Sequence, residues 1–340
     1  MSDQHTPLLE VRGLAVSFKT PAGLLRVVDG ISFDVEKGEC LAIVGESGCG
    51  KTVSAVSILG LLNRKRAVIE GSIKLEGREL VGLSENELRP IRGGKIGIIF
   101  QEPLSALNPV TTIGEQIAEV IVAHRGLKWP EAHRQAISYL DQVEIAQADR
   151  RAGQFPHQLS GGMRQRAMIA MALAGEPQLI IADEPTTALD VTIQAQVLDL
   201  LKRTAKERGA SLMLITHDLG VVAETANRIA VMYAGQIVEY GPAAAVLRGP
   251  ASPYARDLVQ SIPSFSRRGK QLTAIAGNVP SPAEFPSGCR FHPRCQYAIK
   301  ACAEAVPALI ELGEGRGVRC IRSADLDALA ANAASKGGAK

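Results

Sequence analysis

The sequence predicts an α/β fold with a parallel central sheet, followed by a smaller C-terminal extension of a different kind. Two observations predict it. Between residues 8 and 241, short apolar runs alternate with helical patterns, and strands that are apolar on both faces need helices on both sides. After residue 242 prolines recur, and four of the six cysteines lie there, so the last part of the chain is not built on the same pattern.

Length, charge and hydropathy narrow the possible classes of protein. A chain of 340 residues suits one large domain with an appended part, or two domains. Its net charge of +3 is too small to predict nucleic-acid binding, which needs a concentrated basic surface. The first residues carry no charged-then-apolar leader, and no apolar run approaches the ~18 residues that cross a bilayer. We therefore expect the chain to stay in the cytoplasm and to reach a membrane only through partners.

The predicted elements follow in chain order. Residues 8–40 and 68–82 contain β-rich runs joined by turns, which predicts an antiparallel side sheet. Residues 113–175 show no strong strand signal and are predicted to be mostly helical. A helix is also predicted over 191–207, where Gly209 would end it. The apolar runs predicted to form buried parallel strands are 41–44, 96–100, 179–182, 212–216 and 229–233.

Changes in amino-acid composition along the chain divide it into three parts. We expect one domain over residues 8–245, with a helical subdomain at about 104–170. The extension would cover residues 246–325. The Ala-rich end, residues 326–340, is predicted to be a disordered tail.

A glycine-rich loop follows the first buried strand and precedes an apolar helix predicted over 53–62. It fits G-x-x-x-x-G-K-[ST] in full. Its glycines allow backbone N–H groups to surround phosphate oxygens at the positive end of a helix dipole. Lys51 would reach the β- and γ-phosphates, and the Thr52 hydroxyl would bind Mg²⁺. The loop consists of Gly45, Glu46, Ser47, Gly48, Cys49, Gly50, Lys51 and Thr52.

Two carboxylates end the strand predicted over 179–182. Asp183 would lie beside the phosphate loop, where it could hold Mg²⁺ through water. Glu184 is one residue further along and would face the γ-phosphate, where a carboxylate can polarise the attacking water. An apolar strand that ends in Asp-Glu is weak evidence alone, but behind a complete phosphate loop it predicts nucleotide hydrolysis.

The stretch Leu-Ser-Gly-Gly-Met-Arg-Gln-Arg at residues 159–166 resembles the signature sequence of ABC ATPases. It stands just before the Asp183–Glu184 pair, as it does in that family. Other family markers occur in order and extend the resemblance over residues 8–241. They are the adenine-stacking aromatic at Phe18, the Q-loop glutamine at Gln101, the D-loop at Ala188-Leu189-Asp190 and the switch histidine at His217.

The resemblance implies a role for each marker. Ser160, Gly161 and Gly162 open a helix, and this second anion site would close over ATP held by another ATPase subunit. Gln101 would bind Mg²⁺ or the attacking water and lie where the membrane partner docks. His217 would hydrogen-bond the γ-phosphate. Because every catalytic position is intact, we expect an active ATPase with ATP and Mg²⁺ as ligands.

Four cysteines in the extension form a separate candidate site. Their thiolates could bind Zn²⁺ or an iron–sulfur cluster, or the thiols could carry no ligand. Neither the C-x2-C pairs of zinc sites nor common ferredoxin spacing is present, and the loose, unequal spacing favours a cluster over zinc. The four are Cys289, Cys295, Cys302 and Cys320.

The same extension resembles the C-terminal region of oligopeptide and dipeptide importer ATPases. The similarity lies in Ser252-Pro253-Tyr254, in residues 277–282, and in the stretch from Gly288 to Cys295. The family usually has His-Pro-Tyr at the first of these, so the role of that motif is not implied here. The resemblance implies that the four cysteines hold a [4Fe–4S] cluster with a structural or regulatory role.

The sequence therefore predicts the ATPase subunit of a peptide importer, on the cytoplasmic face of the membrane. Its partners would be two transmembrane permease subunits, a paralogous ATPase or a second copy of itself, and an extracytoplasmic peptide-binding protein, with no nucleic acid. An importer of nickel or another small solute is the alternative. A non-transport ABC ATPase is disfavoured because the chain has one ATPase domain and no heptad run, and the extension argues against an exporter.

Overall fold

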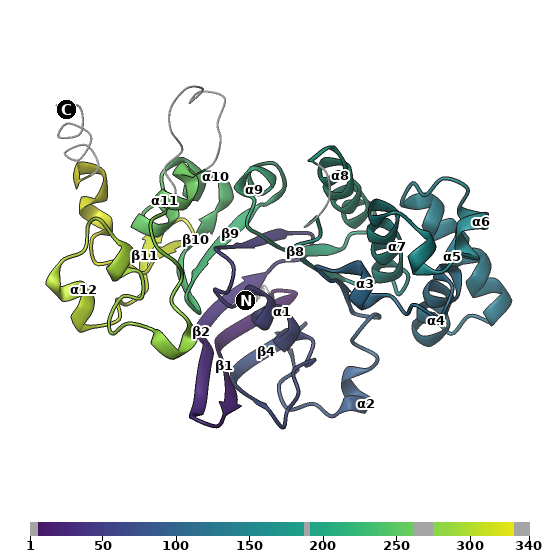
Figure 1. Cartoon of the computed structure of the whole chain (residues 1–340), viewed down its shortest axis with the longest axis horizontal. Coiled ribbons are helices and arrows are strands. Elements are labelled where there is room, and N and C mark those ends of the chain that lie inside the picture. Colours follow the sequence, from purple (N-terminus) through teal and green to yellow (C-terminus); the bar gives the residue numbers. More distant parts are fainter. Residues whose placement is uncertain (1–5, 187–190, 262–274, 330–340) are drawn as a thin grey trace, which may run out of the picture.

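The computed structural model describes residues 6–186, 191–261 and 275–329. Its centre is an eight-stranded sheet in the order β11-β12-β10-β9-β3-β8-β7-β6 (Figure 1). The five predicted strands are confirmed, and all of them pair in parallel. They are β3 (Cys40–Val44), β6 (Ile96–Ile99), β7 (Leu179–Asp183), β8 (Ser211–Thr216) and β9 (Arg228–Tyr233).

The predicted antiparallel side sheet is also confirmed. It has four strands in the order β2-β1-β4-β5, and its apolar side chains form one core with helix α1 (Lys51–Ile58) and one face of the central sheet. Figure 1 shows it below the central sheet, in purple and blue. Its strands are β1 (Leu9–Thr20), β2 (Gly23–Val35), β4 (Ala67–Leu75) and β5 (Arg78–Glu79).

Helices build the arm at the right of Figure 1 and cover the central sheet. The predicted helical character of residues 113–175 is confirmed by α4 (Ile113–Arg125), α5 (Trp129–Gln142), α6 (Ala148–Ala152) and α7 (Gly161–Leu173). The helix predicted over 191–207 is α8 (Val191–Glu207), and α1 (Lys51–Ile58) ends earlier than the predicted 62 because Gly60 turns the chain at φ +60°. The shorter helices here are α2 (Glu85–Leu88), α3 (Pro103–Ala106) and α9 (Leu219–Thr225).

The C-terminal extension continues the central sheet, which the sequence did not predict. The antiparallel strand β10 pairs with β9 on one side and with β12 on the other, and β11 forms the edge. The extension lies at the left of Figure 1. The strand β10 (Gln236–Pro242) and the helix α10 (Ala243–Arg248) lead into it. Its own elements are α11 (Pro253–Gln260), α12 (Lys300–Glu304), β11 (Ile310–Gly313) and β12 (Arg316–Val318).

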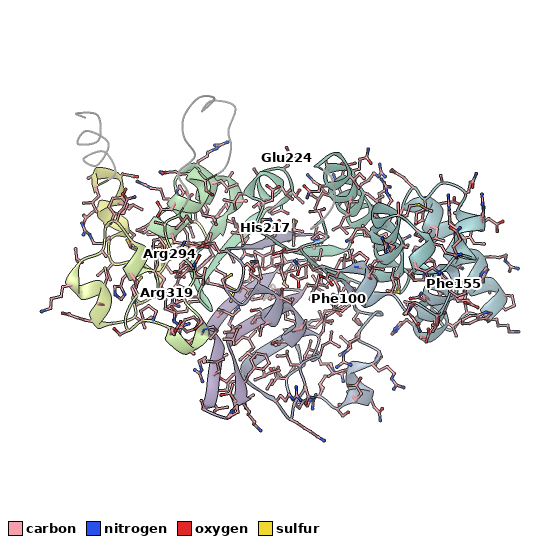
Figure 2. All side chains as sticks on the ribbon, in the orientation of Figure 1. Phe100, Phe155, His217, Glu224, Arg294 and Arg319 are labelled. Carbon is pink, nitrogen blue, oxygen red and sulfur yellow. The ribbon has the colours of Figure 1, made fainter. Side chains whose placement is uncertain are left out.

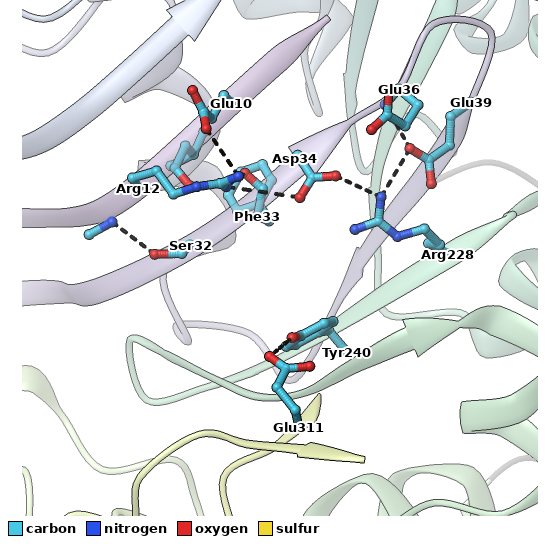
Figure 3. Close-up of polar contacts among 12 residues, drawn as sticks. Glu10, Arg12, Ser32, Phe33, Asp34, Glu36, Glu39, Arg228, Tyr240 and Glu311 are labelled. Carbon is cyan, nitrogen blue, oxygen red and sulfur yellow. Dashed lines mark hydrogen bonds and ion pairs between the residues drawn. The ribbon is translucent and has the colours of Figure 1, made fainter. Parts of the chain in front are cut away.

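Ion pairs join these sheets at their margins (Figure 3). Arg228 at the start of β9 donates to Asp34 of β2 at 2.9 Å and to Glu39 at 3.4 Å, so it ties the side sheet to the central sheet. Burial raises the pKa of Glu39, although hydrogen bonding and the Arg228 charge oppose this. Within the central sheet, the Tyr240 hydroxyl of β10 donates a hydrogen bond to Glu311 of β11.

A buried carboxylate attaches the extension to the sheet. Glu239 of β10 has no exposed surface. It accepts the backbone N–H groups of Ala251 at 2.9 and 3.0 Å and of Ser252 at 2.8 Å. Arg316 of β12 supplies the counter-charge at 2.8 Å. One side chain therefore joins β10, β12 and the turn that begins α11.

The predicted tail needs one correction. Leu326 is buried, and its carbonyl accepts a hydrogen bond from Arg256 of α11, which also pairs with Asp327. The docked chain thus continues beyond residue 325, because Arg256 binds both Leu326 and Asp327. Residues 330–340 lie outside the described part. Within the described ranges, no helix has both the length and the apolar character to cross a membrane.

Glu239→Ala should lower the free energy of unfolding by about 3 kcal/mol, because it leaves Arg316 and two backbone donors without their buried acceptor. Urea denaturation followed by circular dichroism measures this. Asp327→Ala is the matched control: its carboxylate is 96% exposed, so the loss should stay below about 1 kcal/mol. Equal losses in the two variants would contradict the attachment role of Glu239.

Candidate functional site

The glycine-rich loop runs from the end of β3 to the start of α1, and two of its glycines are required by the backbone. Gly45 has φ +154°, and a Cβ there would lie 2.1 Å from the carbonyl oxygen of Met232. Gly50 has φ +103° and forms the N-cap of α1. Residues with a side chain rarely adopt such angles, so the loop geometry needs glycine at both positions.

Lys51 lies under this loop with 4% of its surface exposed. Its ammonium group donates to the carbonyls of Gly45 at 2.8 Å and Glu46 at 3.1 Å. The same nitrogen is 3.8 Å from the Glu184 carboxylate. The lysine therefore connects the loop with the carboxylates that end β7.

Asp183, the last residue of β7, is 3% exposed. Burial raises the pKa of Asp183, whereas a hydrogen bond with Thr52 and the charge of Lys51 lower it. Among the described residues, its Oδ1 atom is buried without a hydrogen-bond partner. A buried carboxylate oxygen with free lone pairs, next to a hydroxyl, is a donor set that suits a hard divalent cation.

Glu184 stands at the centre of a polar cluster. Its φ of +46° is unusual for a residue with a side chain, and its N–H donates to the Ile215 carbonyl of β8 at 2.9 Å. The carboxylate accepts from Gln101 Nε2 at 3.0 Å and lies 3.5 Å from His217 Nδ1. His217 is visible near the middle of the molecule in Figure 2. The structure thus brings together three residues that the sequence placed far apart.

Other predicted residues lie away from this cluster. Ser160 caps α7 and accepts the Met163 N–H at 3.4 Å, so Gly161 and Gly162 begin that helix as expected. Phe18 is half-buried on β1 and packs against the core next to α1. The predicted D-loop at 188–190 lies outside the described residues. The remaining loop positions are Ser47 and Gly48, which are both exposed, and Cys49, which is fully buried.

Two residues of the extension contact the loop, and the sequence analysis missed them. Arg294 forms an ion pair with the Glu46 carboxylate, 248 positions away, and the Tyr254 hydroxyl accepts the Glu46 N–H. Both lie in stretches that resemble importer ATPases, which was the only available signal. No spacing rule could connect them with residue 46, because the contact depends on how the extension folds back.

The four cysteines of the extension line a single cavity. In the described residues, no three Cys, His, Asp or Glu side chains are placed to share one metal ion, so the expected [4Fe–4S] cluster stays a prediction. Two of the sulfurs nevertheless accept a backbone N–H, that of Ile299 at Cys302 (3.5 Å) and that of Arg322 at Cys320 (3.3 Å).

The thiols also influence each other's protonation. Burial raises the pKa of Cys289 and Cys320, and it raises the pKa of Cys295 to about 12. The charges of neighbouring cysteines add to the effect at all three, while the backbone N–H groups oppose it. Several thiolates could therefore exist here together only with a positively charged group between them.

Two protein families match the sequence. Residues 28–187 match the family described as ABC transporter, and residues 238–302 match the oligopeptide/dipeptide transporter C-terminal region. A Brucella ovis protein, named as a peptide import ATP-binding protein, is 51% identical over 93% of this chain and 97% of its own. The oligopeptide transport ATP-binding protein AppD of Bacillus subtilis is 48% identical over 92% of this chain and 96% of its own.

Solved structures agree with these relatives. The ATP-binding cassette MJ0796, in a dimeric post-hydrolysis state with ADP and Pi, superposes with a TM-score of 0.62 at 30% identity, over 69% of this chain and 98% of its own. CbiO1 from Clostridium perfringens superposes with a TM-score of 0.60 at 26% identity, over 71% of this chain and 91% of its own. The chain therefore belongs to the ABC transporter family.

Proposed function

We propose that this protein is the ATP-binding and hydrolysing subunit of an ABC importer for dipeptides or oligopeptides. One observation carries the proposal: the lysine of a complete phosphate loop, the carboxylates that end β7, and the Gln101 and His217 side chains meet at one edge of the parallel sheet. The peptide class is supported by the matched C-terminal region and by relatives named for peptide import.

We propose a task for each side chain of this cluster. The loop N–H groups and Lys51 would bind the β- and γ-phosphates. Thr52, Asp183 and Gln101 would hold Mg²⁺, which neutralises charge on the phosphates. Glu184 would orient and deprotonate the attacking water, and His217 would hydrogen-bond the γ-phosphate. The hydrogen bond from Gln101 orients the Glu184 carboxylate.

A second ATPase subunit completes the site. Ser160, Gly161 and Gly162 begin α7, a helix of thirteen residues whose first N–H groups can bind an anion. Among the described residues they make no hydrogen bond with the Lys51–Glu184 cluster. They would instead close over ATP held by a paralogous ATPase or a second copy of this chain. The similar MJ0796 cassette is a dimer in its post-hydrolysis state.

Membrane subunits would dock beside Gln101. Two apolar side chains close to it in sequence are exposed, Leu104 at 59% and Val110 at 80%, and exposed apolar groups of this kind suit a protein partner. We place two transmembrane permease subunits there and the ATPase on the cytoplasmic face of the membrane. An extracytoplasmic peptide-binding protein would deliver the substrate to the permeases.

For the extension we propose a [4Fe–4S] cluster held by Cys289, Cys295, Cys302 and Cys320. Four cysteines that line one cavity, two of them with sulfurs that accept a backbone N–H, fit thiolate ligands. A single Zn²⁺ is disfavoured by the loose, unequal spacing of the four cysteines, which lacks C-x2-C pairs. When bound, the cluster would cross-link the turns of the extension. ATP hydrolysis has no redox step, so the role is structural or regulatory.

Glu184→Gln should retain ATP binding and lower the rate of hydrolysis by at least about 100-fold, because the amide cannot accept the proton of water. It should also stabilise the nucleotide-closed dimer. Phosphate release and size-exclusion chromatography with ATP measure the two effects. Glu224→Gln, on an exposed part of α9, should hydrolyse ATP normally. Near-normal turnover by Glu184→Gln would rule out the assigned role.

The transport role predicts that the chain co-purifies with its permeases. In the reconstituted complex with its binding protein, peptides should stimulate ATP hydrolysis, because substrate delivery drives the ATPase subunits together. A series of peptides of different length, with Ni²⁺ as the alternative substrate, identifies the cargo. Stimulation by Ni²⁺ and not by any peptide would contradict peptide import.

Cys295→Ser should abolish iron binding by protein prepared without oxygen, because one of four ligands is lost. Cys40→Ser, a buried thiol in β3, should leave the iron content unchanged. Visible absorption and elemental analysis for iron and zinc measure the outcome. A colourless, iron-free parent protein would exclude the cluster.

A further inference from the structure

We infer that the C-terminal extension positions the phosphate loop for nucleotide binding, and that Arg294 is the positioning residue. Arg294 holds Glu46, the second residue of the loop, through two parallel hydrogen bonds. Its Nη1 atom is 2.8 Å from Glu46 Oε2, and its Nη2 atom is 3.0 Å from Oε1. A two-point guanidinium–carboxylate pair fixes both distance and orientation.

The extension holds this guanidinium rigidly. Arg294 donates to the carbonyls of Ala276 at 2.8 Å and Gly277 at 3.1 Å. Its charged carbon lies 5.7 Å from the Tyr233 ring centre and 5.9 Å from that of Phe291. Only 7% of the side chain is exposed, and Figure 2 shows it on the side of the sheet that faces the extension. The pair is therefore shielded from solvent and built from both parts of the chain.

A second contact fixes the backbone at the same position. The Tyr254 hydroxyl accepts the Glu46 N–H at 3.0 Å. Tyr254 is 1% exposed, and its ring packs against Tyr233 at 4.6 Å and Phe291 at 5.3 Å between centres. Ser252 caps the same helix by accepting the Ala255 N–H. The Ser-Pro-Tyr stretch thus presents its tyrosine to the loop, so the extension holds both the main chain and the side chain of Glu46.

Charge explains why the loop needs this support. A carboxylate on the phosphate loop would repel the phosphates of a bound nucleotide if it were unpaired. Arg294 neutralises this carboxylate and holds it against the extension. Nucleotide binding and docking of the extension should therefore favour each other, since coupling between two sites is reciprocal. The inference rests on the proposed role of the loop in binding nucleotide phosphates.

Arg294→Met in the full chain should weaken binding of Mg²⁺-ADP and Mg²⁺-ATP by about fivefold or more, measured by titration calorimetry. Arg290→Met is the matched control. Arg290 also joins the extension to the core, through Asp29 at 2.5 Å and the Ala234 carbonyl at 2.5 Å, but in the described structure it makes no bond to the phosphate loop. Its loss should change nucleotide affinity by less than about twofold.

A second substitution separates charge from folding. In the Arg294→Met background, Glu46→Gln should restore most of the affinity, because it removes the unpaired charge. Arg294→Lys keeps the positive charge and should bind nucleotide more tightly than Arg294→Met. If Arg294→Met does not fold, Arg294→Lys replaces it in the comparison with the parent protein. Equal losses at Arg290 and Arg294, or no loss at Arg294, would overturn the inference. Absence of nucleotide binding by the parent protein would instead contradict the proposed function of the loop.

Discussion

Parallel pairing of β3 with β8, and of β8 with β7, is the constraint on which the site depends. The register aligns Val44 with Thr216 and Asp183 with Ile215, so the three strands end side by side. Residues that follow these ends must then gather at one edge of the sheet. The phosphate loop follows β3, Glu184 follows β7, and His217 follows β8. The register of these three strands therefore brings the residues of the site together.

The extension uses a different principle. It adds antiparallel strands to the edge of the parallel sheet and is held there by charged groups that are largely removed from water. Glu239 is the clearest example, because a carboxylate without exposed surface needs all of its partners. The Tyr233, Tyr254 and Phe291 rings fill the space between the extension and the loop. An appended part fixed in this way can support the nucleotide site, which an appendage on a flexible linker could not do.

The four-cysteine cavity belongs to the same support. Cys295 directly follows Arg294 in the chain, and the Cys289 carbonyl accepts hydrogen bonds from the N–H and ring of His292. A group that fixes the four sulfurs would also fix the backbone that carries Arg294. The proposed cluster and the support of the phosphate loop are therefore structurally linked, although ATP hydrolysis itself needs no electron transfer.

The sequence by itself determined the elements that have local or motif signals. Apolar runs predicted the five parallel strands, and the ordered motifs predicted which residues form the nucleotide site. Strands β10, β11 and β12 were not predicted, although β10 follows β9, and β12 follows β11, after a short turn. Only the pairing of β10 with β12 joins segments far apart in the chain. Only the tertiary structure decided the left-handed backbone of Glu184 and the approach of Gln101 and His217 to its carboxylate. It also decided the contacts of Arg294 and Tyr254 with Glu46. Side-chain spacing encodes local periodicity, whereas contacts over more than 200 residues arise only when the sheets close around a common core.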